Sequence, residues 1–216
     1  MKYFTAISAG LALAGLTAAA PLELLQKKSA VKSAAELIGE VAPNSLSCSG
    51  AVSVADCRTN MAVAQPFIDA FQKYKLEYNG QIAAVLALTA FETTDYKYKH
   101  NVSPGRPGQG TSNMQMINYN IEYANSIPEL KDKVAALGTI DTDAKKNSLL
   151  ALVTDDKYNY GSGPWFLTTQ CPKVVDQFAP GNDMDAAFNA YMACVGVTAT
   201  PDRLAYWTRA KTAFYL

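Results

Sequence analysis

The chain has 216 residues, 49% of them hydrophobic, and its 19 basic residues balance 19 acidic ones. This is enough for one well-filled core. Removing an N-terminal targeting segment would take away Lys2 alone, which leaves 18 basic residues (19 less one) against 19 acidic ones. A charge so close to neutral provides no electrostatic footprint for nucleic acid or an anionic membrane, so we expect neither as a partner.

Residues 1–20 have the pattern of a signal peptide. Lys2 gives a positive start, residues 4–16 are apolar, and Ala18 to Ala20 supply the small residues of a cleavage site. The stretch is too short and too rich in alanine for a lasting membrane span. We therefore expect a secreted, extracellular protein without a membrane anchor after cleavage. Residues 21–47 fit either a propeptide or an N-terminal helical extension, and the sequence favours neither.

The cysteines agree with export. Cys48, Cys57, Cys171 and Cys194 make an even number in a chain with a signal sequence, which predicts disulfides. Three pairings are open, and we favour Cys48 with Cys57 and Cys171 with Cys194. The spacing does not fit a zinc site, and the chain has one histidine, so we expect no metal and no cofactor.

Residues 48–216 read as one mainly α domain. Apolar residues recur at helical spacing from residue 58 onward. We expect helices over 61–75, 81–92, 116–125, 126–137, 141–153 (capped by Asp141 or Thr142), 163–169, 183–195 (ending at Gly196), and a last one opened by Thr200 and Pro201. The best strand signal is a short hairpin between Val102 and Met116, which gives the fold a small β component.

Glu92 is the strongest catalytic candidate. It ends an uncharged run over residues 81–91 and precedes a loop rich in Pro and Gly over residues 103–110. Apolar neighbours and the C-terminus of a helix both disfavour a carboxylate, so we expect a raised pKa. Such a carboxylic acid can protonate the leaving oxygen of a glycosidic bond. The alternative is an exposed glutamate at a frayed helix end.

A resemblance supports the catalytic interpretation. Glu92, the loop and the segment Ser112, Asn113, Met114 and Gln115 resemble the pattern of goose-type lysozymes and lytic transglycosylases. The segment Tyr158 to Pro164, read as YNYGSGP, is similar to a second motif of that family. The resemblance covers about residues 80–165. It departs from the family where Ser-Asn replaces Gly-Leu, and where residues 101–115 contain no Asp or Glu.

The resemblance implies a lysozyme-like single domain that cuts the glycan strand of peptidoglycan, and we expect a monomer. The signal peptide and the possible propeptide are compatible with a secreting eukaryote such as a fungus. Glu92 would be the general acid and Asp95 the candidate second carboxylate. Residues 112–115, with Asn159 and Tyr160, would bind the sugar. Chitin or chitosan is an alternative substrate, and a non-catalytic glycan- or host-binding protein of this fold is an alternative function. Hydrolysis and lytic transglycosylation both remain open.

Other catalytic schemes lack the necessary residues. The chain contains no Gly-x-Ser-x-Gly nucleophile motif, and a catalytic triad would depend on His100, the sole histidine. We expect His100 to be a polar loop residue. Asn101 to Ser103 is a glycosylation sequon, but Pro104 follows it directly.

Overall fold

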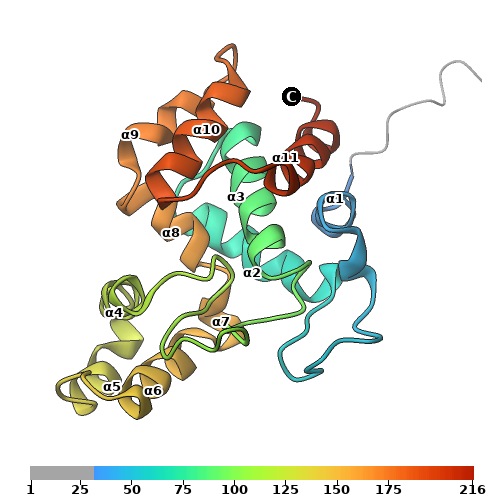
Figure 1. Cartoon of the computed structure of the whole chain (residues 1–216). Helices are drawn as coiled ribbons and strands as arrows, with labels where there is room; N and C mark the ends of the chain where they lie inside the picture. The colour runs from blue at the N-terminus through green and yellow to red at the C-terminus, as the bar shows by residue number, and fades with distance from the viewer. Residues whose placement is uncertain (1–31) are drawn as a thin grey trace, which may run out of the picture. The chain divides into compact units, whose positions relative to one another are not determined.

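The computed structural model describes residues 32–216, which are mostly helical (Figure 1). The α-helices are α1 (Ala34–Val41), α2 (Asn60–Lys73), α3 (Asn79–Glu92), α4 (Ile117–Ser126), α5 (Lys131–Ala136), α6 (Asp143–Val153), α7 (Asp156–Asn159), α8 (Ser162–Thr169), α9 (Pro172–Val175), α10 (Met184–Val195) and α11 (Pro201–Phe214). Short 3-10 turns are η2 (Pro43–Leu46), η3 (Pro128–Leu130) and η4 (Asp176–Phe178). The predicted mainly α class is confirmed.

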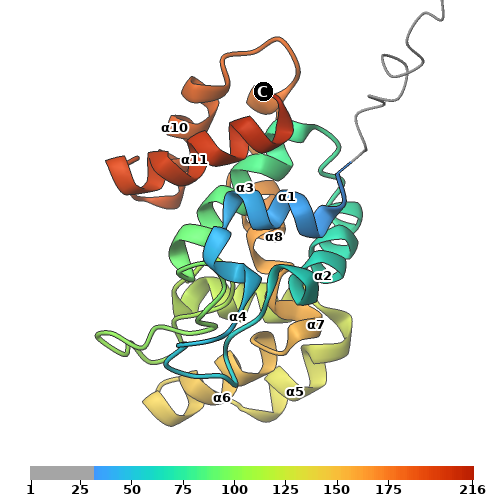
Figure 2. The same cartoon turned by 90° about the vertical axis from the view of Figure 1, so that its right-hand side faces the viewer.

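Helix α3 is surrounded by other helices because it has no polar side. Its buried residues are Gly80, Gln81, Ala83, Ala84, Val85, Leu86, Ala87, Leu88, Thr89 and Ala90. Helices α1, α8 and α11 and the turn η4 all contact it, and Figures 1 and 2 show α3 between them. Small side chains permit this close approach, since larger ones would hold the neighbouring helices away. The core of the described domain is therefore built around α3.

Both ends of α3 are fixed by specific contacts. At its start, Oε1 of Gln81 accepts hydrogen bonds from the backbone N–H groups of Glu77 (2.9 Å) and Tyr78 (3.0 Å). At its end, residues 94–96 have positive φ angles of 52°, 57° and 62°. Left-handed residues cannot continue a right-handed helix. The chain therefore turns away sharply and leaves Glu92 as the last helical residue.

Several predicted helix boundaries are confirmed by their caps. The side chain of Thr142 accepts a hydrogen bond from the backbone N–H of Lys145 at the start of α6. Thr200 caps α11 in the same way through Arg203. Gly196, with φ of 82°, ends α10. Hydroxyl caps and a left-handed glycine are the ordinary solutions to unpaired groups at helix ends.

The predicted β-hairpin is not formed as a pair of strands. Between Val102 and Met116 the described chain has only isolated antiparallel bridges, which join Gly110 to His100 and to Gln115. The segment turns too often for a ladder to grow, because Gly105 and Gly108 have positive φ and Pro104 lacks an N–H donor. This stretch is a loop held by side chains.

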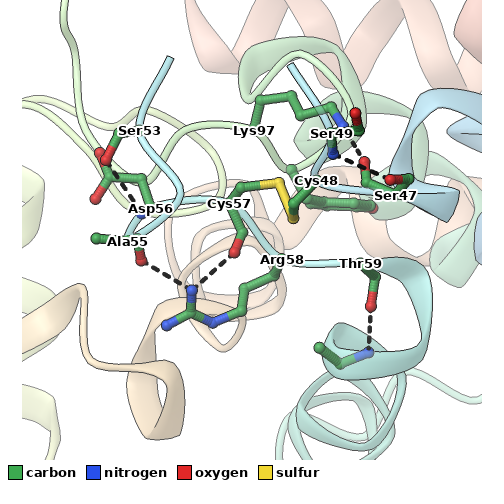
Figure 3. Close-up of a disulfide and its surroundings, with 12 residues drawn as sticks. Ser47, Cys48, Ser49, Ser53, Ala55, Asp56, Cys57, Arg58, Thr59 and Lys97 are labelled. Atoms are coloured by element: carbon green, nitrogen blue, oxygen red, sulfur yellow. Dashed lines mark hydrogen bonds between the residues drawn. A yellow bond between two sulfur atoms is a disulfide. The ribbon is translucent and has the colours of Figure 1, made fainter. Parts of the chain in front are cut away.

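The favoured disulfide pairing is confirmed, and Figure 3 shows the first of the two bonds. Cys48 bonds to Cys57, and Cys171 bonds to Cys194. The first bond closes a short loop after η2. The second ties the start of α9 to α10. No cysteine is free in the described domain, and paired cysteines fit the oxidising compartments of secreted proteins.

The signal peptide predicted for residues 1–20 lies outside the described residues, as does the first part of the stretch 21–47. The rest of that stretch forms α1 and η2, and it adds Ile38 and Val41 to the core. Helix α1 contacts α2, α3 and α11. Within residues 32–216, no helix is both long enough and apolar enough to cross a membrane.

The two disulfides should stabilise the fold unequally. They join residues 9 and 23 positions apart, and the entropy of loop closure makes the longer one worth roughly 0.8 kcal/mol more. Replacing Cys171 and Cys194 together with alanine should lower the free energy of unfolding by about 3 kcal/mol. Urea unfolding followed by circular dichroism measures both double variants. A larger loss on replacing Cys48 and Cys57 would contradict this expectation.

Candidate functional site

Glu92 lies in an ion pair between two helices. Its Oε1 accepts a hydrogen bond of 3.0 Å from Nη2 of Arg203 on α11. The two side chains are only 19% and 17% exposed. The guanidinium of Arg203 also lies over the ring of Phe91, 4.4 Å from its centroid. The geometry therefore gives Glu92 a structural role, which is to fasten α11 to the end of α3.

The surroundings of Glu92 include the burial that the sequence predicts and a partner, Arg203, that it does not. Burial raises the pKa of its carboxyl group, as expected from its apolar neighbours, while Arg203 opposes the shift. Nearby, Tyr191 is fully buried and its hydroxyl has no hydrogen-bond partner among the described residues. Burial, and then the charge of Glu92, raise the pKa of Tyr191. Arg203 could not be foreseen, because it is 111 residues away in sequence.

Asp95 is buried and cannot share an open cleft with Glu92, which corrects its proposed role as a second carboxylate. Asp95 is only 1% exposed. Oδ2 accepts a hydrogen bond of 2.9 Å from the backbone N–H of Asn44, and Oδ1 has no partner within the described residues. Burial and then Asp95 raise the pKa of Tyr206. Asp95 thus connects the left-handed turn after α3 to the segment after α1.

In the predicted sugar-binding segment 112–115, polar side chains form hydrogen bonds that stabilise their own loop. Nδ2 of Asn113 donates to Oε1 of Gln115 (3.1 Å), and Nε2 of Gln115 donates to Oδ1 of Asn120 (2.8 Å). Nδ2 of Asn120 then donates to the carbonyl oxygen of Gly108 (2.8 Å). Ser112, Asn113 and Gln115 are buried, and Met114 is half-buried. Buried amides with their partners in place stabilise a loop that has no strand ladder.

Asn159 and Tyr160 are also interior residues, 1% and 2% exposed. The ring of Tyr160 packs against Phe67, with 5.1 Å between centroids. The two segments that carry the resemblance do meet, since Oγ of Ser112 lies 3.1 Å from Oγ of Ser162. The structure therefore brings these segments together through packing contacts, and it encloses Asn159 and Tyr160 almost completely.

An apolar groove on another face was not predicted. It consists of two adjoining cavities, of about 230 Å³ and about 430 Å³. Ile68, Phe71 and Ile82 line both cavities. We call the combined cavity the α2–α3 groove; its other apolar lining residues are Ala34, Leu37, Ile38, Ala64, Phe67, Leu76, Leu86 and Phe214.

The sequence did contain one sign of this groove. Helix α2 carries Val63, Phe67 and Phe71 on its buried face, but Ala64 and Ile68 on a neighbouring face are only half-buried. A helix whose apolar stripe is wider than the core requires leaves apolar surface to be covered. Four helices contribute to the groove, so its shape depends on packing that the local pattern does not specify.

No metal site is apparent. Within residues 32–216, no three His, Cys, Asp or Glu side chains come together as a metal ion would need.

Comparison with known proteins gives one informative relative. No family model and no solved structure matches the chain. A protein of Fusarium oxysporum (strain Fo5176), named bifunctional dioxygenase (DOX)-epoxy alcohol synthase (EAS), is 52% identical over 157 residues. The match covers 71% of this chain but only 12% of the relative. The name therefore describes a much longer enzyme, and does not say which part of it carries either activity.

The predicted cleavage of peptidoglycan, chitin or chitosan is wrong. The relative is named as an oxygenase and a synthase, and not as a glycosidase or muramidase. The geometry agrees, because Glu92 is held by Arg203 and Asp95 is buried. The motifs that suggested glycan chemistry are explained here by their packing roles.

The raised pKa of Glu92 should give stability a particular dependence on pH. The folded state keeps the Glu92 proton over a pH window in which the unfolded chain has released it, so the free energy of unfolding falls as pH rises. This window opens near the ordinary pKa of 4.5. Glu92→Gln removes the contribution, so wild-type stability relative to this variant should be greatest at low pH. Urea unfolding on both sides of this value measures the difference.

Glu129→Gln is the matched control, because the pKa of Glu129 is lowered by a backbone hydrogen bond and then by Lys157. Its contribution has the opposite sign, being present above the unfolded pKa and lost as pH falls. Equal pH dependence in the wild type and Glu92→Gln would contradict the expectation for Glu92.

Proposed function

We propose that this chain is a binding domain for an oxygenated hydrocarbon of the epoxy alcohol class, and that the ligand lies in the α2–α3 groove. The observation that carries the proposal is that two neighbouring apolar cavities share Ile68, Phe71 and Ile82 as lining residues. Their combined size falls within the range of roughly 300–1,000 Å³ usual for small-molecule sites. The relative's name supports the ligand class, since an epoxy alcohol is the product named for its synthase activity.

The groove is suited to a molecule with an apolar body and a few oxygen atoms. In the smaller cavity, which we call the inner one, Asn79 is the only polar lining residue among those described. The larger, outer cavity adds Gln72, Lys75 and Glu77. Burial of hydrocarbon is worth about 25 cal/mol per Å², and the hydroxyl and oxirane oxygens would bond to the polar side chains at the outer end. Apolar surface would supply affinity and the polar end would supply orientation.

The position of the groove favours binding over proton transfer by Glu92. Leu86, the groove residue of α3 nearest to Glu92 in sequence, is six residues away, which corresponds to about 9 Å along a helix axis at 1.5 Å per residue. Neither Glu92 nor Arg203 lines the groove. We infer that the domain holds or presents a ligand for oxygenase chemistry carried out elsewhere.

We also propose that the fold is lysozyme-like, without the associated activity. The segment 158–164 lies against α3, where a Cβ atom on Gly163 would come within 3.0 Å of Thr89. The same segment bonds to the loop after Glu92 through Ser162 and Ser112. Both motifs are thus arranged around one buried helix, and this arrangement supports a structural resemblance.

Binding can be tested by calorimetric titration of the whole protein with a medium-chain epoxy alcohol. Ile68→Ser and Ile82→Ser should each weaken binding about tenfold, because loss of one buried aliphatic contact is worth about 1.5 kcal/mol or more. Val54→Ser is the control, since Val54 is 73% exposed and does not line the groove.

A second ligand separates the two parts of this proposal. An unbranched alcohol of equal length, without the epoxide, should bind more weakly. Equal affinity for both would reject the ligand class while leaving an apolar site. Absence of binding by the wild type, or equal weakening by Val54→Ser, would reject the groove itself.

A further inference from the structure

A separate, more polar cavity lies beside the loop that follows His100. It has a volume of about 520 Å³ and is lined by His100, Asn101, Val102, Gly105, Arg106, Asn147, Leu150, Ala151 and Thr154. It shares no lining residue with the α2–α3 groove. The loop forms one wall and α6 forms the other. The size is that of a small-molecule site.

The ionisable residues that line this cavity are basic. Among the described residues that line it, none is acidic, and Arg106 and His100 are basic. Asn147 uses Oδ1 to accept a hydrogen bond of 3.0 Å from the backbone N–H of Gly108. Its Nδ2 donates no hydrogen bond within residues 32–216 and is free for a ligand. An arginine fork beside an amide donor matches the oxygens of a carboxylate.

The imidazole of His100 lies close to one carboxylate. Its Nδ1 is 3.1 Å from Oδ2 of Asp56, a contact that is an ion pair when the ring is protonated. Asp56 is adjacent to Cys57, and Figure 3 shows it in the loop that the first disulfide closes. Its backbone N–H donates to Oγ of Ser53 (3.4 Å). The only histidine of the chain therefore lies beside a carboxylate carried by a covalently closed loop.

The apolar part of the lining defines the rest of the ligand. The cavity's apolar lining residues are Leu150 and Ala151 on α6 and Val102 on the loop. Asn101 is not available to a ligand, because its side chain bonds to Gln109 and to the backbone N–H of Gly105. These same bonds occupy the amide of the glycosylation sequon. The cavity thus combines a cationic end with a small apolar surface.

We propose that this cavity binds a small organic carboxylate, with Arg106 and the Nδ2 group of Asn147 contacting the carboxylate and Leu150 contacting the body of the ligand. His100 would lie beside the anion, with Asp56 close to its Nδ1. The site is independent of the groove, so either can fail without the other.

The sole histidine makes a direct experiment possible, because its imidazole proton resonances in the NMR spectrum belong to one residue. Titration of the full chain with benzoate should move these resonances to saturation. Benzamide, which has the same shape but no charge, should move them much less. Arg106→Gln should raise the Kd for benzoate about tenfold through loss of a charge-assisted hydrogen bond.

Lys133→Gln is the matched control, since Lys133 is an exposed cation on α5 and does not line the cavity. It should bind benzoate like the wild type. Three results would each overturn the proposal: a response that does not saturate, equal responses to benzoate and benzamide, or an unchanged Kd in Arg106→Gln. Arg106 is exposed, so its replacement should not disturb folding.

Discussion

The structure depends on the burial of a helix that has no polar face. Most of α3 is removed from solvent, and α1, α8 and α11 must therefore cover it on several sides. Small residues make this packing tight, as at Gly80, where a Cβ atom would lie 2.8 Å from the carbonyl oxygen of Phe178. The one charge on α3, at Glu92, is placed at its end and given Arg203 as a partner. A charged side chain in the buried turns of α3 would be costly, because burying a charge without a partner is unfavourable.

Local chemistry made much of the fold predictable. Helical periodicity and threonine caps depend on a few neighbouring residues, and the predicted caps are present at α6 and α11. The even number of cysteines predicted disulfides, and both are formed. The hairpin did not follow, because its glycines and prolines favour turns over pairing. The candidate site was less predictable. Whether Glu92 is free or paired depends on Arg203, and nothing near residue 92 signals a contact with α11.

Two segments of the sequence were misleading, because side chains that pack them together are of the types that also bind sugars. Residues 112–115 and 158–164 are rich in Asn, Ser, Gln and Tyr, which are the side chains that bind sugars but also those that satisfy buried loops. In this chain they bond to one another, as Ser112 and Ser162 show. The two cavities for which we propose ligands lie elsewhere, in an apolar groove between helices and in a cationic cavity beside α6. The wide apolar stripe of α2 is a local sign of the groove, but the shape of either cavity depends on segments far apart in sequence.

Helix α11 contacts both α1 and α3, although each precedes it by more than a hundred residues, as the Glu92 to Arg203 pair illustrates. Arg209 also donates a hydrogen bond to the carbonyl oxygen of Val41 (2.9 Å). On a ribosome, α3 would emerge long before the helix that shields it, leaving its greasy surface uncovered during translation. Pairings between segments so far apart in sequence form late, because a long loop must close before they can be made. The core around α3 can therefore be completed only after α11 has been synthesised.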